Sequence, residues 1–404
     1  MSNTILYNCK LENRKTAVDI HINDQKISKI ADHVSTPKGQ TNYNGKLITV
    51  GLAESHLHLD KACILERSDI EEGTLDEAVE ETGKAKDKFT EADVYQRALK
   101  VIQMIIPNGT TSVRTYVETD SKTELHSLKA IQKLKNDVAH QVDLDIVAFA
   151  QNGLTTAPKT IELLKKAFDS GVQTIGGCPY KDENPEAHID LVFELALEYD
   201  LHVDFHMDFD LEDSDSSIPY LCSVIDKTQF KNRVSIGHVT KLMAFKTEKR
   251  KRLEKLLADH NVSVCVLPAT DLFLNGRDSD KMIPRGVLRA TEFEDLDLNA
   301  AISSNNILNA FTPYGDGNLL RMANLYANVS QLSTDAEMDQ CFEMITTNAY
   351  KILGSSRKIE VGQPADLVLW NTDSIASAVR TIPQALAGWK AGKQTFENSA
   401  PTIF

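Results

Sequence analysis

"GLAESHLHLDK", residues 51–61, contains two histidines two positions apart, His56 and His58. The apolar run "LITVGLAESH" that leads into the pair predicts a β-strand. Alternate residues of a strand face the same side, roughly 6.6 Å apart at a rise of ~3.3 Å per residue. Imidazoles placed in this way can close on one metal ion at Zn–N distances of ~2.0–2.1 Å. A histidine at a strand end can equally be a hydrogen-bonded core residue, so the pair alone leaves both interpretations open.

Seven further β-branched runs follow this strand, and segments with helical periodicity separate most of them. One such segment, "TIELLKKAFDSG", ends at Gly171, a residue that commonly terminates helices. The eight strands and their crossovers predict an α/β fold of the (β/α)₈ TIM-barrel class. The seven additional strands are expected at residues 110–117, 144–151, 172–177, 201–206, 233–238, 262–267 and 298–304.

The two ends of the chain have a different pattern. Residues 1–50 and 351–404 show strand-like alternation interrupted by Asn, Asp and Gly turns. Neither segment has enough apolar residues to fold alone, so we expect them to pair into one small β-sandwich domain. The barrel would then occupy residues 51–350, and a chain of 404 residues is long enough for both units.

Composition excludes several classes of function. The formal net charge of -14 argues against a nucleic-acid partner, and the basic cluster at residues 246–255 alternates with Glu like a solvated helix face. No signal peptide and no apolar stretch of about 20 residues occurs, which predicts a cytoplasmic protein without a membrane partner. Its six cysteines are scattered without CxxC spacing, as expected for reduced thiols.

Histidines end several of the predicted strands. His56 and His58 end the first strand, His206 the fifth and His238 the sixth. In a barrel of this type the carboxyl ends of the strands form the active site, so these side chains are expected to converge. A third histidine beside the HxH pair would complete three ligands and leave a position for water, the arrangement of a catalytic metal. The sequence therefore predicts one divalent metal ion, zinc or iron.

Further motifs follow in a characteristic order: "FAQNG", "FHMDF", "GHVTKL", "LPATDLFLNGR", "PYGDGNLL" and "GQPADLVLW". Together with "GLAESHLHLDK" they resemble the amidohydrolase superfamily, in particular its cytosine deaminase-like branch, over essentially the whole chain. That branch includes cytosine deaminase and N-isopropylammelide isopropylaminohydrolase. The resemblance implies a metal-dependent hydrolase that attacks a C–N bond of a small nitrogen heterocycle through a metal-bound hydroxide, and it also suggests a homo-oligomer.

The resemblance assigns roles to residues of this chain. It implies that His56, His58 and His206 bind the metal and that His238 orients the water on it. Gln151 matches a position that hydrogen-bonds the pyrimidine ring, and residues 274–277 match a substrate-facing stretch. Within that stretch, the guanidinium of Arg277 offers a planar donor fork for an anionic or carbonyl-rich substrate.

Three positions depart from the family pattern. Asn305 stands where the family has a metal-binding aspartate, Phe209 where it has an acidic proton shuttle, and Tyr116 where related sequences usually have His. An amide can offer its oxygen to a metal but cannot act as a carboxylate base. A positioned acid or base typically contributes ~10²–10⁴-fold, although His238 could accept the proton instead. The alternative hypothesis is therefore a catalytically silent member that binds a small ligand.

Four charged residues near the predicted pocket are further candidates for contact with the substrate. Lys61 and Asp60 follow the HxH pair, and Arg114 and Glu118 surround the second barrel strand. Each could face the substrate, and Lys61 could instead form an ion pair in a loop. Two other functional classes are excluded, because the chain has neither the PCxxC signature of the other zinc deaminases nor a phosphate-binding glycine motif after a predicted strand.

Overall fold

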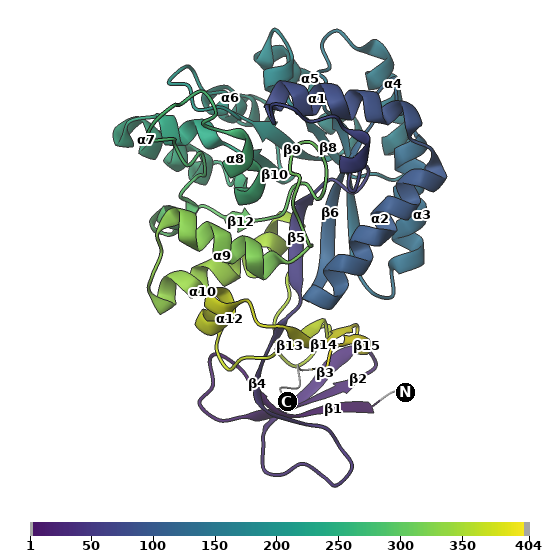
Figure 1. The fold of residues 1–404 in the computed structure, drawn as a ribbon, viewed down its shortest axis with the longest axis vertical. Helices are drawn as coiled ribbons and strands as arrows, with labels where there is room; N and C mark the ends of the chain where they lie inside the picture. Colours follow the sequence, from purple (N-terminus) through teal and green to yellow (C-terminus); the bar gives the residue numbers. More distant parts are fainter. Residues whose placement is uncertain (1–2, 400–404) are drawn as a thin grey trace.

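The computed structural model describes residues 3–399, whose strands form two sheets (Figure 1). The larger sheet contains eight parallel strands that neighbour one another in sequence order. They are β5 (Leu52–Leu57), β6 (Thr110–Glu118), β7 (Asp143–Ala150), β8 (Thr174–Gly177), β9 (His202–Met207), β10 (Val234–His238), β11 (Ser263–Val266) and β12 (Ala300–Ile302). Each lies within or next to a run that the sequence predicted to be a strand.

The first and last strands of this sheet approach each other. A parallel bridge joins Leu57 to Asn305, just beyond the end of β12. The backbone N–H of His58 donates to the Asn305 carbonyl at 2.9 Å, and the N–H of Asn305 donates to the His56 carbonyl at 2.9 Å. These bonds nearly close the sheet into a barrel and so confirm the predicted TIM-barrel class.

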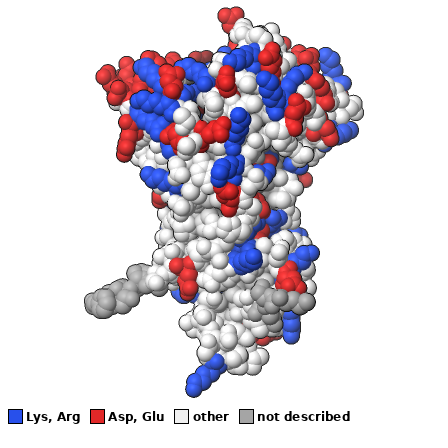
Figure 2. Space-filling model, turned by 90° about the vertical axis from the view of Figure 1, so that its right-hand side faces the viewer, with Lys and Arg blue, Asp and Glu red and all other residues white. Residues whose placement is uncertain are grey.

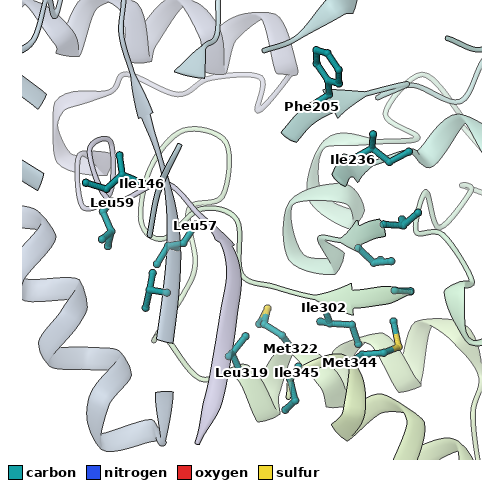
Figure 3. Close-up of a cluster of buried hydrophobic side chains, with 14 of the residues drawn as sticks. Leu57, Leu59, Ile146, Phe205, Ile236, Ile302, Leu319, Met322, Met344 and Ile345 are labelled. Atoms are coloured by element: carbon teal, nitrogen blue, oxygen red, sulfur yellow. The ribbon is translucent and has the colours of Figure 1, made fainter. Parts of the chain in front are cut away.

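Helices cover the outside of the barrel. Outward-facing strand residues such as Ile236 and Ile302 are fully buried in one apolar core with the helices, and Figure 3 shows Ile302 near Leu319 and Met322. Several helices begin at a Thr or Asn whose side chain accepts a backbone N–H, which satisfies an otherwise unpaired donor. The helices of the barrel are α1 (Leu75–Ala85), α2 (Glu91–Ile105), α3 (His126–Val138), α4 (Pro158–Asp169), α5 (Pro185–Tyr199), α6 (Ile218–Thr228), α7 (Thr247–Asp259), α8 (Pro268–Leu274), α9 (Leu319–Ser330), α10 (Asp335–Met344) and α11 (Thr347–Ile352).

The second sheet combines both ends of the chain, as the sequence predicted. Its order is β15-β14-β13-β4-β1-β2-β3, and β4 pairs in parallel with β1 and antiparallel with β13. The strands form one continuous mixed sheet, so the two-layer packing of a sandwich and the boundaries at residues 50 and 351 stay predictions. Its strands are β1 (Asn3–Lys10), β2 (Val18–Asn23), β3 (Lys26–Asp32), β4 (Asn42–Val50), β13 (Leu367–Trp370), β14 (Ala385–Lys390) and β15 (Lys393–Glu397), and α12 (Ile375–Thr381) lies between β13 and β14.

A cluster of four charges connects the small sheet to the barrel. Lys390 of β14 donates to Asp143 at 2.6 Å and to Asp366 at 2.7 Å, and Arg357 binds the same two carboxylates at 3.1 and 2.8 Å. Asp366 is buried, and Asp143 starts barrel strand β7. The burial of Asp366 would raise its pKa, but Lys390 and Arg357 outweigh this effect and lower the pKa.

The surface shows no large area of a single charge on the face in Figure 2, where acidic and basic side chains are intermixed over the barrel. The predicted basic helix face corresponds to α7, whose Leu253 and Leu257 are buried. Within residues 3–399, none of the helices has both the length and the apolar character needed to cross a membrane. The cytoplasmic location stays a prediction.

Candidate metal centre and pocket

A β-bulge in β5 aims the histidine pair into the barrel. Glu54 pairs with Val113, and Leu57 pairs with Thr115. Between these two pairs β5 advances by three residues and β6 by only two, so β5 contains one extra residue. Consecutive residues Ser55 and His56 therefore both face inward: Ser55 Oγ contacts Cys265 Sγ of β11 at 3.5 Å, and His56 Nε2 contacts His206 of β9. Leu57 packs outward instead, and His58 again faces the barrel interior. A bulge of this kind redirects side chains next to a functional site.

The three histidines assigned to the metal converge. His206 Nε2 lies 3.1 Å from His56 Nε2 and 3.0 Å from His58 Nε2. Nitrogens that share one ion at ~2.1 Å and a tetrahedral angle would lie roughly 3.4 Å apart, so the spacing is close to that of a common ion. Burial, followed by neighbouring histidines and Lys61, lowers the pKa of all three well below 6.5. The imidazoles are thus neutral at pH 7 and carry the lone pairs that a metal requires.

The chemistry of this donor set fits a metal ion. In the part of the chain that the structure describes, these histidines are the one group of three or more potential ligands with atoms within 4.8 Å of one another. Their Nδ1 atoms are buried without hydrogen-bond partners, so ring packing fixes their orientation. The Tyr116 ring lies 4.0 Å from His56, and the Phe149 ring lies 4.4 Å from His206, measured between centroids.

His238 is held by an aspartate that was not predicted. Its Nδ1–H donates to Asp271 Oδ1 at 2.6 Å, while Asp271 Oδ2 accepts the Leu267 N–H at 3.2 Å. Asp271 is completely buried; burial raises its pKa, and the interaction with His238 opposes this change. The hydrogen bond assigns the proton to Nδ1 and leaves Nε2 of His238 as an acceptor. The Phe209 ring packs against His238 with a centroid separation of 4.2 Å.

Asn305 lies beside the histidine triad in a left-handed backbone conformation, with φ of 62°. Its backbone bonds to His56 and His58 place it at the seam where the barrel closes. The side-chain Oδ1 is buried and has no hydrogen-bond partner. An amide oxygen in this state is available to a ligand or to a metal ion.

A small cavity collects most of the predicted site residues. Its volume of about 20 Å³ holds roughly one water molecule. The lining combines polar and apolar side chains. The polar residues are His58, Lys61, Gln151, His206, His238, Thr270, Asn305 and Asn306, and the mainly apolar ones are Leu75, Tyr180, Phe209, Leu274 and Phe311.

Lys61 both lines the cavity and forms a buried ion pair, so the two interpretations of this residue are compatible. Its Nζ donates to Glu118 Oε1 at 2.8 Å and to Gln151 Oε1 at 2.9 Å. Burial would raise the pKa of Glu118, but Lys61 and Lys86 outweigh it and lower that pKa. The carboxylate therefore keeps its charge and orients Lys61 toward Gln151.

Three other candidates lie away from the cavity lining. Asp60 Oδ2 accepts the backbone N–H of Glu118 at 2.8 Å. Arg114 is buried deeper in the barrel and pairs with Asp204 at 2.9 Å. Arg277 donates to the carbonyls of Glu72 and Phe273, both at 3.1 Å, and so holds the loop before α1 against α8. A substrate-binding role of Arg277 stays a prediction.

Comparison with known proteins gives consistent results. A family model described as the amidohydrolase family matches residues 47–400. N-isopropylammelide isopropyl amidohydrolase of Pseudomonas sp. (strain ADP) is 26% identical over 403 residues, which cover 96% of each chain.

Solved structures share the fold, and two of them illustrate the similarity. The chain is similar to 5-methylcytosine deaminase from Klebsiella pneumoniae with bound 5-fluorocytosine, with a TM-score of 0.94, 24% identity and 99% of each chain covered. It is also similar to N-isopropylammelide isopropylaminohydrolase from Burkholderia multivorans ATCC 17616, with a TM-score of 0.85 and 23% identity over 98% of this chain and 99% of that one. The composite sheet is thus part of a fold found in full-length relatives.

Proposed function

Because the chain belongs to the amidohydrolase family, in its cytosine deaminase-like branch, and is an enzyme that acts on C–N bonds, we propose that it hydrolyses such a bond in a small nitrogen heterocycle with the help of one divalent metal ion. The observation that carries the proposal is the convergence of the His56, His58 and His206 Nε2 atoms beside the cavity. Buried neutral imidazoles grouped in this way have little use in a purely structural core.

His56, His58 and His206 would hold the ion, and zinc and iron both accept such nitrogen ligands. When bound, a divalent ion lowers the pKa of a coordinated water and so supplies a nucleophile near neutral pH. The chain itself supplies the proton acceptor. His238 Nε2 is free to take a proton because Asp271 holds the other ring nitrogen, and the same atom can return the proton to the leaving nitrogen.

The mixed polar and apolar lining of the cavity supports a heterocyclic substrate with an apolar part. Gln151 and Lys61 offer donors and acceptors to ring nitrogens or carbonyl oxygens. Phe209, Leu274 and Phe311 offer apolar contact in the same cavity. The relatives are named for cytosine-type and isopropylammelide substrates, which supports a pyrimidine or triazine with an amino or alkylamino substituent.

A second candidate is a ligand-binding member without turnover. It is favoured by Asn305 and Phe209, which put an amide and a phenyl ring where a base and a proton shuttle are expected. Family membership and the intact His238–Asp271 pair favour the enzyme. Cytoplasmic location and a homo-oligomeric state stay predictions.

Metal analysis and a substrate screen test the proposal together. The purified protein, expressed with added zinc or iron, should contain about one ion per chain, and replacement of His58 by Ala should reduce this content. The His33→Ala variant is the control, because His33 directly follows β3 and pairs with Asp19 of β2, away from the triad. Cytosine, isoguanine and aminotriazines are then assayed for release of ammonia or amine. A metal-free protein would refute the metal-dependent mechanism, and a metal-loaded protein without turnover would favour the second candidate.

A further inference from the structure

A second buried His–Asp pair lies outside the cavity lining, next to the loop that contains Gln151. His188 of α5 is fully buried, and its Nδ1 lies 2.6 Å from Asp182 Oδ2. Burial lowers the pKa of His188, so the ring is neutral and donates its Nδ1–H to the carboxylate. This pair has no part in the metal site described above.

Asp182 holds the loop that follows β7. Its Oδ2 accepts the Leu154 N–H at 2.8 Å, and its Oδ1 accepts the Thr155 N–H at 3.2 Å and the Thr155 hydroxyl at 2.6 Å. The carboxylate approaches the chain so closely that a Cβ at Gly153 would lie 2.8 Å from Oδ1. Gly153 also has a φ of +90°, a conformation that favours glycine. Gln151, which lines the cavity, begins this loop.

His188 contacts the next strand with its other edge. A Cβ at Gly177, the last residue of β8, would lie 2.2 Å from His188 Nε2, so only glycine leaves room for the ring. Cys178 follows directly, and its Sγ accepts the Gln151 amide at 3.6 Å. The His188–Asp182 pair therefore bridges the loop after β7, which contains Gln151, and the end of β8, which precedes the Gln151 partner Cys178.

We infer that Asp182 and His188 are positioning residues that fix Gln151 toward Lys61 and thereby set the affinity for the substrate. The inference rests on the proposed function only where it assigns substrate binding to Gln151. The pair touches neither the triad nor the cavity. Its loss should consequently weaken substrate binding while leaving the metal and the proton transfer at His238 in place.

The Asp182→Asn variant tests this role, because an amide keeps the size of the side chain but places an N–H against other donors. The Asp19→Asn variant is a matched control: Asp19 also accepts a histidine Nδ1, at 2.7 Å, and a backbone N–H, at 2.9 Å, but in the small sheet. In Asp182→Asn, we expect a KM about tenfold higher, a kcat within about threefold and an unchanged metal content. The Asp19→Asn control should keep the KM and the kcat of the wild type.

Hydrogen exchange and a crystal structure provide a readout that does not need turnover. The amides of Leu154 and Thr155 should exchange at least about tenfold faster in Asp182→Asn, and Gln151 should move away from Lys61 Nζ. The His188→Asn variant should reproduce both effects. Unchanged exchange with Gln151 in place would overturn the inference, as would a loss of kcat with KM retained. If the wild-type protein has no activity, the proposed function fails, and the exchange and structural results still decide the positioning role.

Discussion

Asn305 is the residue at which this chain differs most from the chemistry expected at the end of the last barrel strand. Its backbone makes the hydrogen bonds that close the barrel, while its Oδ1 has no partner. The amide is therefore compatible with the metal site but contributes no negative charge. Three neutral imidazoles and an amide would bind a divalent ion less strongly than a set that includes a carboxylate.

Replacing Asn305 by Asp should strengthen metal binding. Without metal, the new carboxylate is buried without a cation and should lower the thermal midpoint. With zinc present, its charge is compensated, so the metal-induced rise of the midpoint should be larger than in the wild type. Thermal unfolding with and without zinc measures the difference. An equal rise in both proteins would show that the side chain does not reach the ion.

The Asp271→Asn change should impair catalysis without affecting the metal. The amide cannot hold the Nδ1–H tautomer of His238 as the carboxylate does, so kcat should fall by roughly 10²-fold or more. Elemental analysis should still give the metal content of the wild type. A variant with full kcat would exclude His238 as the residue that transfers the proton.

At the level of strands and helices, the sequence predicts the fold better than the site. The eight strands follow from their β-branched runs, and the helices from their periodicity. The bulge in β5 could not be predicted, because alternation alone does not reveal an extra residue such as Ser55. Asp271 was missed for a related reason: it reaches His238 only because β10 and β11 are neighbours and a short helix follows β11.

Arg114 connects two of these strands inside the barrel. It starts from β6 and pairs with Asp204 of β9 at 2.9 Å, and both side chains are almost fully buried. Arg114 keeps a second ion pair with Asp145 at 2.8 Å, so Asp204→Asn removes one of the two partners of this buried guanidinium and should destabilise the protein by about 1–3 kcal/mol. Urea unfolding measures this loss. As a comparison, Asp259→Asn removes an exposed ion pair with Lys255 and should change stability by less than about 1 kcal/mol.

At the scale of the whole molecule, the four-charge cluster joins the small sheet to the barrel. The sequence predicted that the two chain ends would pair, because neither has enough apolar surface alone. It did not predict this junction, since Asp143, Arg357 and Lys390 belong to segments far apart in the chain. These charges come together only when the small sheet packs against the first residue of β7, Asp143.

Asp366→Asn should lower the thermal midpoint in a pH-dependent way. The folded-state pKa of Asp366 is lowered, so its contribution to stability is fully present above the unfolded pKa of 3.8 and disappears as the pH falls through the lower folded pKa. The difference between wild type and variant should therefore be constant from about pH 5 to 8 and shrink in more acidic buffer. A difference that grows on acidification would contradict this assignment.

The position of β4 between β1 and β13 has a consequence for synthesis of the chain. β4 ends at Val50, whereas its partner β13 begins only at Leu367. At about 5–20 residues per second, a ribosome needs roughly 15–60 s to produce the intervening segment. During this time one edge of the emerging strand has no native neighbour and can pair with strands of other nascent polypeptides. Messages truncated upstream of Leu367 should thus yield aggregates or substrates for proteolysis, even when they encode every histidine of the metal site.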